Sequence, residues 1–450
     1  MNVVVCNFPP MPSWNLPGAP AVLLGATKWL GLSAAFLDFN KDPNGTVSFW
    51  AEQILAFDPE VVALSVFTYK SKPKAQELVT LLKQLNPKIT IVAGGSGIKD
   101  SINGKVAMTA DVCIEGDGEV QWPKFLTEFF GIDRQLDFTP MTAPYLPYYG
   151  DYDVNFYKQE AEKVEQPIWV PISGSRGCVR KCTFCEIHEH WKFSQRAPKS
   201  IAAEIEQILT TFDHAHIHFT DSLVNGSLPA FYELLDHLIE IKQRFPKFSW
   251  GSQFIIRNAS QSNEDYWRKI AASGNIVLEI GVETGSDNLR QQMKKNFTNA
   301  DLDHSLEYMD KLGLRAILLM FVGYPTETLD DFHQTLAMLE RYKHLVGKTI
   351  IELQAGYNLS IHPGTPLYTT SRADPNMILT KEVGIWYNKS NPTLTAEERV
   401  RRRKQLQEVA VSLGYTMTYD NTIAIKELEG QLKRDAIIID IVERKIGKNS

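Results

Sequence analysis

The stretch Gly177-Cys178-Val179-Arg180-Lys181-Cys182-Thr183-Phe184-Cys185 follows shortly after an apolar run at 168–172. Cysteine spacings of four and three residues place three thiols on one tight loop, close enough to bind a single inorganic centre. Three protein ligands on a four-iron cluster leave one iron open, and an open iron can bind and activate a cofactor. The run therefore predicts an open-iron cluster at the end of a strand.

A structural zinc site is the alternative interpretation of the same cysteines. Such a site usually needs a fourth Cys or His at similarly short spacing. His188 and His190 lie just beyond the run and could supply that ligand. In that case the chain would be a zinc-stabilised binding module without catalysis.

The three-cysteine run has an aromatic residue immediately before its last cysteine, and it resembles the cluster loop of radical S-adenosylmethionine (SAM) enzymes. The resemblance implies that Cys178, Cys182 and Cys185 hold a [4Fe-4S] cluster whose open iron chelates SAM. Electron transfer into SAM then produces a 5′-deoxyadenosyl radical. Phe184 is expected to contact the cofactor.

Length, charge and composition limit the class of protein. A chain of 450 residues suggests two or three domains, and 44 % hydrophobic with 22 % charged residues is typical of a globular protein. The net charge of −6 gives no sign of a polyanion-binding surface, so we expect no nucleic-acid partner. No apolar run approaches the roughly 20 residues that span a bilayer, so we expect no membrane partner.

The amino terminus and the cysteine usage suggest a compartment. The first residues read as a strand and lack the basic region and long apolar core of a secretory signal. Five cysteines, three of them clustered, argue against a disulfide framework and for a reducing environment. We expect a cytoplasmic enzyme, with Cys6 and Cys113 as small buried hydrophobic residues.

Residues 1–135 alternate apolar strand-like runs with helical segments, which predicts an α/β fold with a doubly wound, Rossmann-like parallel sheet. The expected strands are 3–8, 34–38, 61–67, 89–93 and 112–114. Residues 136–166 are rich in proline and tyrosine with little periodicity, and they are expected to form an ordered linker.

Residues 167–370 contain a second strand–helix alternation, with expected strands at 169–172, 216–219, 248–256, 276–281, 316–321 and 350–355. Six repeats predict a partial (β/α)6 barrel, and the cysteine run follows its first strand, on the face where barrel chemistry occurs. Ser262 and Asp265 suggest a helix start. Residues 371–450 form an expected carboxyl-terminal extension, a small helical region in which Thr395 opens a helix to about residue 413.

The resemblance also implies SAM contacts at several strand ends. Glu283, within the run Gly281-Val282-Glu283-Thr284-Gly285-Ser286, is expected to aim its carboxylate at the cofactor. Gly323 corresponds to a turn where the adenine packs on backbone, although Thr326 stands where relatives often carry glycine. Arg257 is expected to bind the SAM carboxylate. Many relatives hold the SAM amino group with a Gly-Gly-Glu run that this chain lacks, and Asp221 is expected to be the acceptor in its place.

The amino-terminal domain resembles the cobalamin-binding domain of one branch of this family. The resemblance and the small residues at the strand ends imply five cobalamin contacts, namely Ser65, Gly94, Gly95, Gly116 and Gly118. The Asp-x-His-x-x-Gly signature that supplies an axial histidine is missing, and no histidine precedes His188. The lower face of the cobalt would then be open, water-bound or met by another group.

These features predict a cobalamin-dependent radical SAM enzyme, a methyltransferase acting on an unactivated carbon of an unknown substrate. The first alternative keeps the cofactors but performs a rearrangement, cyclisation or oxidation without methyl transfer. A tRNA methylthiotransferase would normally need a second cluster on amino-terminal cysteines, and only Cys6 and Cys113 are available. We expect an external one-electron donor such as flavodoxin or ferredoxin as a partner. Three histidines that alternate along one strand are expected to pack or face solvent rather than bind metal, namely His214, His216 and His218.

Overall fold

The computed structural model describes residues 1–99, 105–187, 191–380 and 386–417. The alternative zinc ligands His188 and His190 and the end of the predicted extension, 418–450, lie outside this part of the chain. The chain divides into two compact units. The amino-terminal unit comprises Met1–Gly174, Gln195–Thr220 and Glu240–Ser249, and the carboxyl-terminal unit comprises Ser175–Ser194, Asp221–Ile239 and Trp250–Ser450.

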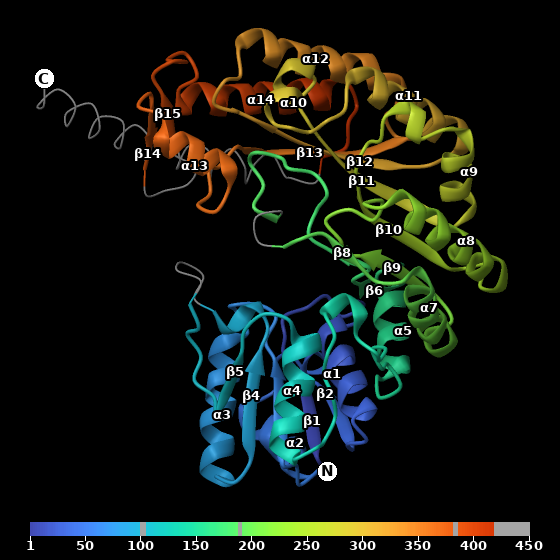
Figure 1. Ribbon diagram of the computed structural model, residues 1–450, viewed down its shortest axis with the longest axis vertical. Helices are drawn as coiled ribbons and strands as arrows, with labels where there is room; N and C mark the ends of the chain where they lie inside the picture. Colours follow the sequence, from blue (N-terminus) through green and yellow to red (C-terminus); the bar gives the residue numbers. More distant parts are fainter. Residues whose placement is uncertain (100–104, 188–190, 381–385, 418–450) are drawn as a thin grey trace, which may run out of the picture. The chain divides into compact units, whose positions relative to one another are not determined.

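The amino-terminal unit contains a five-stranded parallel sheet in the order β2-β1-β3-β4-β5 (Figure 1). Its strands are β1 Val3–Asn7, β2 Ala34–Asp38, β3 Val61–Ser65, β4 Thr90–Gly94 and β5 Val112–Ile114. The strand order changes direction between β1 and β3, and ligands bind beyond the carboxyl ends of strands at such a switch point. Asn7 and Ser65 are register partners there.

Helices complete this unit, and the doubly wound fold expected from the sequence is confirmed. Helix α1 packs with α4, and α2 packs with α3. The helices of the unit are α1 Gly18–Trp29, α2 Val47–Leu55, α3 Lys72–Leu85, α4 Gly118–Phe130, α5 Val154–Lys163 and α7 Pro198–Phe212. Cys6 is fully buried in the core between the sheet and α2 and α3, whereas Cys113 is only half-buried.

Six further strands form the second sheet, in the order β13-β12-β11-β10-β9-β6. They are β6 Ile168–Ile172, β9 Ala215–Phe219, β10 Ser249–Phe254, β11 Asn275–Glu283, β12 Ala316–Val322 and β13 Ile350–Asn358. The pairings β6–β9, β10–β11, β11–β12 and β12–β13 are parallel. This is the partial (β/α)6 barrel that the strand–helix alternation predicts.

The remaining helices follow the barrel strands and continue into the extension. They are α8 Leu228–Arg244, α9 Glu264–Ala272, α10 Asp287–Gln292, α11 Asn299–Leu312, α12 Leu329–Tyr342, α13 Pro366–Ala373 and α14 Ala396–Ser412. Short two-stranded pairs join β7 Ser175–Arg176 to β8 Ser194–Gln195 and β14 Met377–Leu379 to β15 Trp386–Asn388. Among the helices of the described residues, none has the length and apolar character needed to cross a membrane.

Two helix starts test the capping predictions. Thr395 caps α14 as expected, because its side chain accepts a hydrogen bond from the N–H of Glu398. The prediction for Ser262 is wrong, because Asn263 caps α9 by accepting from the N–H of Tyr266. Ser262 instead closes the preceding 3-10 turn, where its hydroxyl bonds the carbonyl oxygen of Asn258.

Candidate functional site

The cysteine loop begins at a glycine in the left-handed backbone conformation, which residues with a side chain rarely adopt. Gly177 has φ +74°, and a Cβ there would lie 2.6 Å from the carbonyl oxygen of Trp191. Within the loop, the N–H of Cys185 bonds the carbonyl oxygen of Cys182 at 3.2 Å. The N–H of Arg180 points at the sulfur of Cys178 at 3.3 Å. These short-range bonds fold the run into the tight loop that its spacing predicts.

Hydrogen bonds fix this loop to the segments that follow three barrel strands. Arg180 donates to the carbonyl oxygens of Ile256, after β10, at 2.9 Å and of Asn296 at 3.1 Å. The N–H of Thr183 bonds the carbonyl oxygen of Met293, and its hydroxyl lies 2.9 Å from the hydroxyl of Tyr324, after β12. The three sulfurs are therefore held at the carboxyl ends of the barrel strands.

The thiols are in an environment that disfavours free thiolates. Burial raises the pKa of Cys182 to about 11, and burial also raises the pKa values of Cys178 and Cys185. Ligation by a cationic centre can compensate this cost, because metal binding displaces the thiol protons. Three soft sulfur donors on one loop fit an iron–sulfur cluster.

The arrangement is not that of a mononuclear site. Within the described ranges, no group of three or more His, Cys, Asp and Glu side chains is placed to hold one metal ion. A cluster makes a different demand, since each thiolate binds its own iron. The donor set thus fits the group that the motif predicts.

A buried ion pair lies beside the thiols. Glu283 ends β11 with φ +66°, and its Oε1 lies 2.8 Å from Nζ of Lys295. Burial lowers the pKa of Lys295, but the negative charges of Glu283 and Cys182 outweigh it, so the net pKa is raised. The ammonium group also lies 5.9 Å from the ring centre of Phe184. Sequence reasoning predicted Glu283 and Phe184 at this site and missed Lys295.

The turn after β12 shows where Gly323 lies. Gly323 has φ +88°, and its N–H donates to Oε2 of Glu327 at 3.1 Å. A Cβ at this position would meet the side chain of Arg399, so one side of the glycine is already packed. Phe184 contacts Phe321 of β12 edge to face, with ring centres 5.0 Å apart. The cysteine loop and this turn therefore share one neighbourhood.

The two other predicted SAM contacts hold loops in place. The guanidinium of Arg257 donates to the carbonyl oxygens of Asn225 and Gly226, and burial lowers its pKa. Its Nε is buried without a hydrogen-bond partner. Asp221 accepts a hydrogen bond from the N–H of Ser175 at 2.9 Å. Their contacts with SAM stay predictions.

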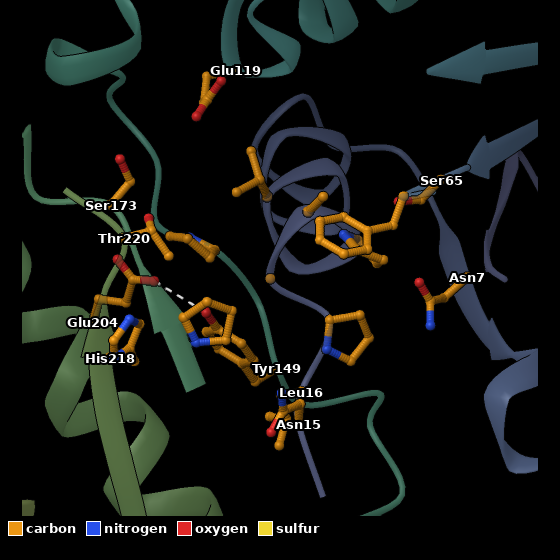
Figure 2. A pocket seen from close by; sticks show the side chains of 18 of the residues that line it. Asn7, Asn15, Leu16, Ser65, Glu119, Tyr149, Ser173, Glu204, His218 and Thr220 are labelled. Carbon is orange, nitrogen blue, oxygen red and sulfur yellow. Dashed lines mark hydrogen bonds between the residues drawn. The ribbon is translucent and has the colours of Figure 1, made fainter. Parts of the chain in front are cut away.

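The amino-terminal unit has a cavity of about 480 Å³, which we call the switch-point cavity. Figure 2 shows Asn7 and Ser65, from the ends of β1 and β3, on one side of it. His218, at the end of β9, lies on the other side with Glu204. The lining of the cavity is mostly apolar. The apolar lining residues include Pro10, Met11, Pro12, Leu16, Met141 and Trp169.

Of the predicted cobalamin contacts, Ser65 lines this cavity and the glycines do not. Gly95 has φ +101°, and a Cβ there would lie 2.5 Å from the carbonyl oxygen of Val66. Gly116 has φ +89° with open space at its Cβ position, and Gly94 and Gly118 have room for a Cβ. The positive φ angles at Gly95 and Gly116 thus explain glycine at these two positions without a ligand. Their contact with a cofactor stays a prediction.

A doubly wound sheet with a cavity at its switch point, joined to a partial barrel that carries a three-cysteine loop, defines a class of cofactor-dependent enzymes. Residues 172–339 match the Radical SAM superfamily, and this region is a radical SAM domain. Such a domain implies a [4Fe-4S] cluster and SAM as cofactors.

Two curated relatives share low sequence identity with this chain. A tRNA-2-methylthio-N(6)-dimethylallyladenosine synthase of Hydrogenobaculum is 27 % identical over 207 residues, which cover 43 % of this chain and 43 % of that protein. An uncharacterized methyltransferase of Pyrococcus horikoshii is 20 % identical over 356 residues, 74 % of each chain. The match to the first relative thus spans less than half of its length.

Solved structures match nearly the whole fold. The radical SAM methyltransferase TsrM from Kitasatospora setae, determined with tryptophan substrate and a SAM analog, has a TM-score of 0.65 at 15 % identity. The match covers 91 % of this chain and 89 % of that one. The cobalamin-dependent SAM radical enzyme OxsB has a TM-score of 0.63 at 16 % identity, covering 92 % of this chain and 67 % of OxsB. The chain therefore has the fold of cobalamin-dependent radical SAM enzymes.

Proposed function

We propose that the chain is a cobalamin-dependent radical SAM methyltransferase that acts on an unactivated carbon. One observation carries the proposal: a loop fixed to barrel strand ends carries three thiols, of which Cys182 is buried and Cys178 and Cys185 are half-buried, in a chain that also has a cavity at the switch point of a doubly wound sheet. When bound, the cluster supplies the electron that cleaves SAM, and cobalamin supplies the methyl group. The structures of TsrM and OxsB, which this fold resembles, both contain cobalamin.

The residues of this chain would bind and orient these groups. Cys178, Cys182 and Cys185 would lose their protons and hold the cluster. Glu283, fixed by Lys295, would accept hydrogen bonds from SAM, because a carboxylate offers several acceptor sites. The N–H of Gly323 is already used by Glu327, so it would not be free to bond the adenine.

The switch-point cavity supports cobalamin binding in the amino-terminal unit. Asn7 and Ser65 would meet the cofactor at the carboxyl ends of β1 and β3, and apolar side chains would exclude water. No histidine precedes His188 in the sequence. An axial cobalt ligand from the doubly wound domain would thus have to be a group other than imidazole.

The tRNA methylthiotransferase alternative is favoured by the 27 % identical relative. A second cluster on amino-terminal cysteines would have to use Cys6, yet Cys6 is fully buried in the core and burial raises its pKa strongly. Cys113 alone cannot hold a cluster, and its thiol bonds the carbonyl oxygen of Met108. We therefore prefer the cobalamin-dependent methyltransferase that acts on an unactivated carbon.

Oxygen-free purification with supplied cobalamin tests the proposal. Iron, sulfide and corrinoid are measured on one sample, with an external one-electron donor such as flavodoxin added for turnover. Replacing Cys178 by Ala should abolish deoxyadenosine formation, whereas Cys113→Ala, outside the loop, should leave it unchanged. Product that gains a methyl group from labelled SAM supports methylation; a product of unchanged methyl count supports rearrangement, cyclisation or oxidation. A colourless protein that contains zinc in place of iron would refute the proposed enzymatic function.

A further inference from the structure

A sulfur donor lies in the switch-point cavity, beside the residues proposed to meet the cofactor. Met11 follows β1, is half-buried and lines the cavity together with Asn7 and Ser65. The side-chain amide of Asn7 donates to the thioether sulfur of Met11, with 3.7 Å between nitrogen and sulfur. Figure 2 shows Asn7 and Ser65 on one wall of the cavity. The sulfur of Met11 therefore lies at this wall, near the carboxyl ends of β1 and β3.

Hydrogen bonds to one buried side chain fix the backbone of Met11. Its N–H donates to Oδ1 of Asn40 at 3.0 Å, and its carbonyl oxygen accepts from Nδ2 of the same residue at 3.1 Å. Asn40 is only 6 % exposed. Pro10 and Pro12 flank Met11 and restrict the chain further, because a proline ring fixes φ. The side chain of Met11 thus starts from a fixed point at the cavity wall.

The hydrogen bond from Asn7 leaves the sulfur able to bind a metal. A thioether sulfur has two lone pairs, and Asn7 uses one of them. Asn7 is itself held in place, because its Nδ2 also donates to Oδ1 of Asp38 at 2.8 Å. Such outer hydrogen bonds commonly orient metal ligands in proteins. A thioether has no proton to lose, so it can bind a metal without the deprotonation that a thiol requires.

Other donors that line the cavity are less suited to a reduced cobalt centre, which is soft. Asn7 and Ser65 offer neutral oxygen atoms, and such hard donors prefer hard metal ions. The hydroxyl of Tyr145 donates to the carbonyl oxygen of Glu119, and burial raises its pKa, so it keeps its proton. His218 lies on the other side of the cavity (Figure 2). A thioether is a soft donor, and methionine is an axial ligand to the iron of a tetrapyrrole in cytochromes c.

We propose that the thioether sulfur of Met11 is the lower axial ligand of the cobalt in bound cobalamin. The inference rests on the proposed function, in which the switch-point cavity holds that cofactor. Met11 would take the place of the axial histidine that the sequence lacks. Coordination forms one sulfur–cobalt bond, displaces any water from that position, and changes neither the proton count nor the oxidation state.

Electron paramagnetic resonance of bound cob(II)alamin tests the ligand directly, because the unpaired electron on cobalt interacts with the nuclei of an axial ligand. The full chain is reconstituted with cluster and cobalamin without oxygen, and the cluster is kept oxidised and diamagnetic. The parent should show no nitrogen splitting, since the common sulfur nucleus has no spin. Met11→Leu conserves the side-chain volume and removes the sulfur, so its spectrum should shift to that of cobalt without a protein ligand.

Met11→His tests whether a side chain at this position reaches the cobalt. An imidazole nitrogen bound there should split the cobalt lines into three, because the common nitrogen nucleus has three spin orientations. Met141→Leu is the matched control for Met11→Leu. Met141 also lines the cavity, but it belongs to the 3-10 turn Pro140–Thr142. Its replacement should leave the cobalt spectrum unchanged.

Each outcome decides the inference. Nitrogen splitting in the parent would overturn it in favour of the cofactor's own benzimidazole or of His218, and His218→Phe tells these two apart. An unchanged spectrum in Met11→Leu, a change in Met141→Leu instead, or no nitrogen splitting in corrinoid-loaded Met11→His would also overturn it.

Iron and corrinoid are measured on the same samples, so that two kinds of failure are distinguished. A parent protein that retains no corrinoid contradicts the proposed function. Any of the overturning spectra from protein with full corrinoid content contradicts this inference alone.

Discussion

Arg402 of helix α14 and Glu327 of the turn after β12 form an ion pair with 3.0 Å between Nη1 and Oε2, and both side chains are almost completely buried. The same Oε2 accepts the N–H of Gly323 at 3.1 Å. Arg402 also donates to the carbonyl oxygen of Thr328 at 3.0 Å. The carboxyl-terminal extension thus helps to hold the turn that is expected to contact SAM.

Replacing Arg402 by Met should destabilise the protein strongly. Removal of one partner leaves the other charge buried and unpaired, which typically costs about 3–5 kcal/mol. Arg401→Met is the matched control, because Arg401 is exposed and, among the described residues, its hydrogen bonds go to Glu398 and Gln405 on its own helix. Denaturant unfolding of the two variants and the parent measures the difference. The double variant Glu327→Gln/Arg402→Met should recover part of the loss, and equal midpoints for the two single arginine variants would refute the role of the pair.

The pH dependence of stability should carry the signature of Glu327. Burial raises its pKa from 4.5 to about 7, although Arg402 acts in the opposite direction. Between these two pH values the folded protein holds a proton that the unfolded chain has released. Stability from this group is therefore present below pH 4.5 and is lost as the pH rises to about 7.

Glu327→Gln removes that titration. The free energy of unfolding of the parent, minus that of the variant, should fall by up to about 3 kcal/mol across this window and then stay level. Denaturant unfolding at several pH values, in buffers of equal ionic strength, measures it. A difference that stays constant or increases with pH across the window would contradict the assignment.

The strand–helix alternation of the sequence was sufficient to predict the strands of the two large sheets. Most of these strands are apolar nearly throughout, so their signal is local. The exceptions are β9, with two histidines, and β10, with serine, glycine and glutamine. Helices were harder to predict. Helix α4 contains Pro123, and α5 lies in the proline- and tyrosine-rich segment 136–166, where few buried residues repeat at helical spacing. Their stability comes from contacts with distant residues, such as the bond from the indole N–H of Trp122 to the hydroxyl of Thr27.

The residues of the candidate site also fall into two groups: those that a short run of sequence predicts and those that only the fold brings to the site. The cysteines and Glu283 lie in short runs whose spacing is informative by itself. Lys295 and Arg402 contribute through partners twelve and seventy-five positions away, and only the folded chain brings them together. The alternation of His214, His216 and His218 was a usable signal, because it placed His216 and His218 on one face of β9. It could not show that Trp169 and a cavity lie against that face.

Two glycines near the site should respond differently to alanine. A Cβ at Gly281 would lie 2.5 Å from Oε1 of Glu283 and 2.9 Å from Nζ of Lys295, both at the ends of flexible side chains. A Cβ at Gly285 would lie 2.5 Å from the carbonyl oxygen of Gln334 in α12, which cannot move independently. Gly285→Ala should thus lower stability by about 1–3 kcal/mol, whereas Gly281→Ala should cost less and weaken SAM binding. Thermal unfolding and SAM titration measure the two effects, and the reverse order would be inconsistent with this geometry.

Lys295→Met tests the charge beside the cysteine loop. Lys295 is the cation that pairs with Glu283 at 2.8 Å. Burial raises the pKa values of all three cysteines, and the charge of Lys295 opposes that rise. Without it, the negative charges of the carboxylate and the thiolates would repel one another in a buried setting, so the reconstituted protein should retain less iron and bind SAM about tenfold or more weakly. Lys294→Met is the control, because Lys294 is exposed. Lys295→Arg should restore much of the loss. Iron and sulfide analysis with SAM titration measures both, and full iron content with unchanged SAM affinity in Lys295→Met would show that the ammonium group has no part in the site.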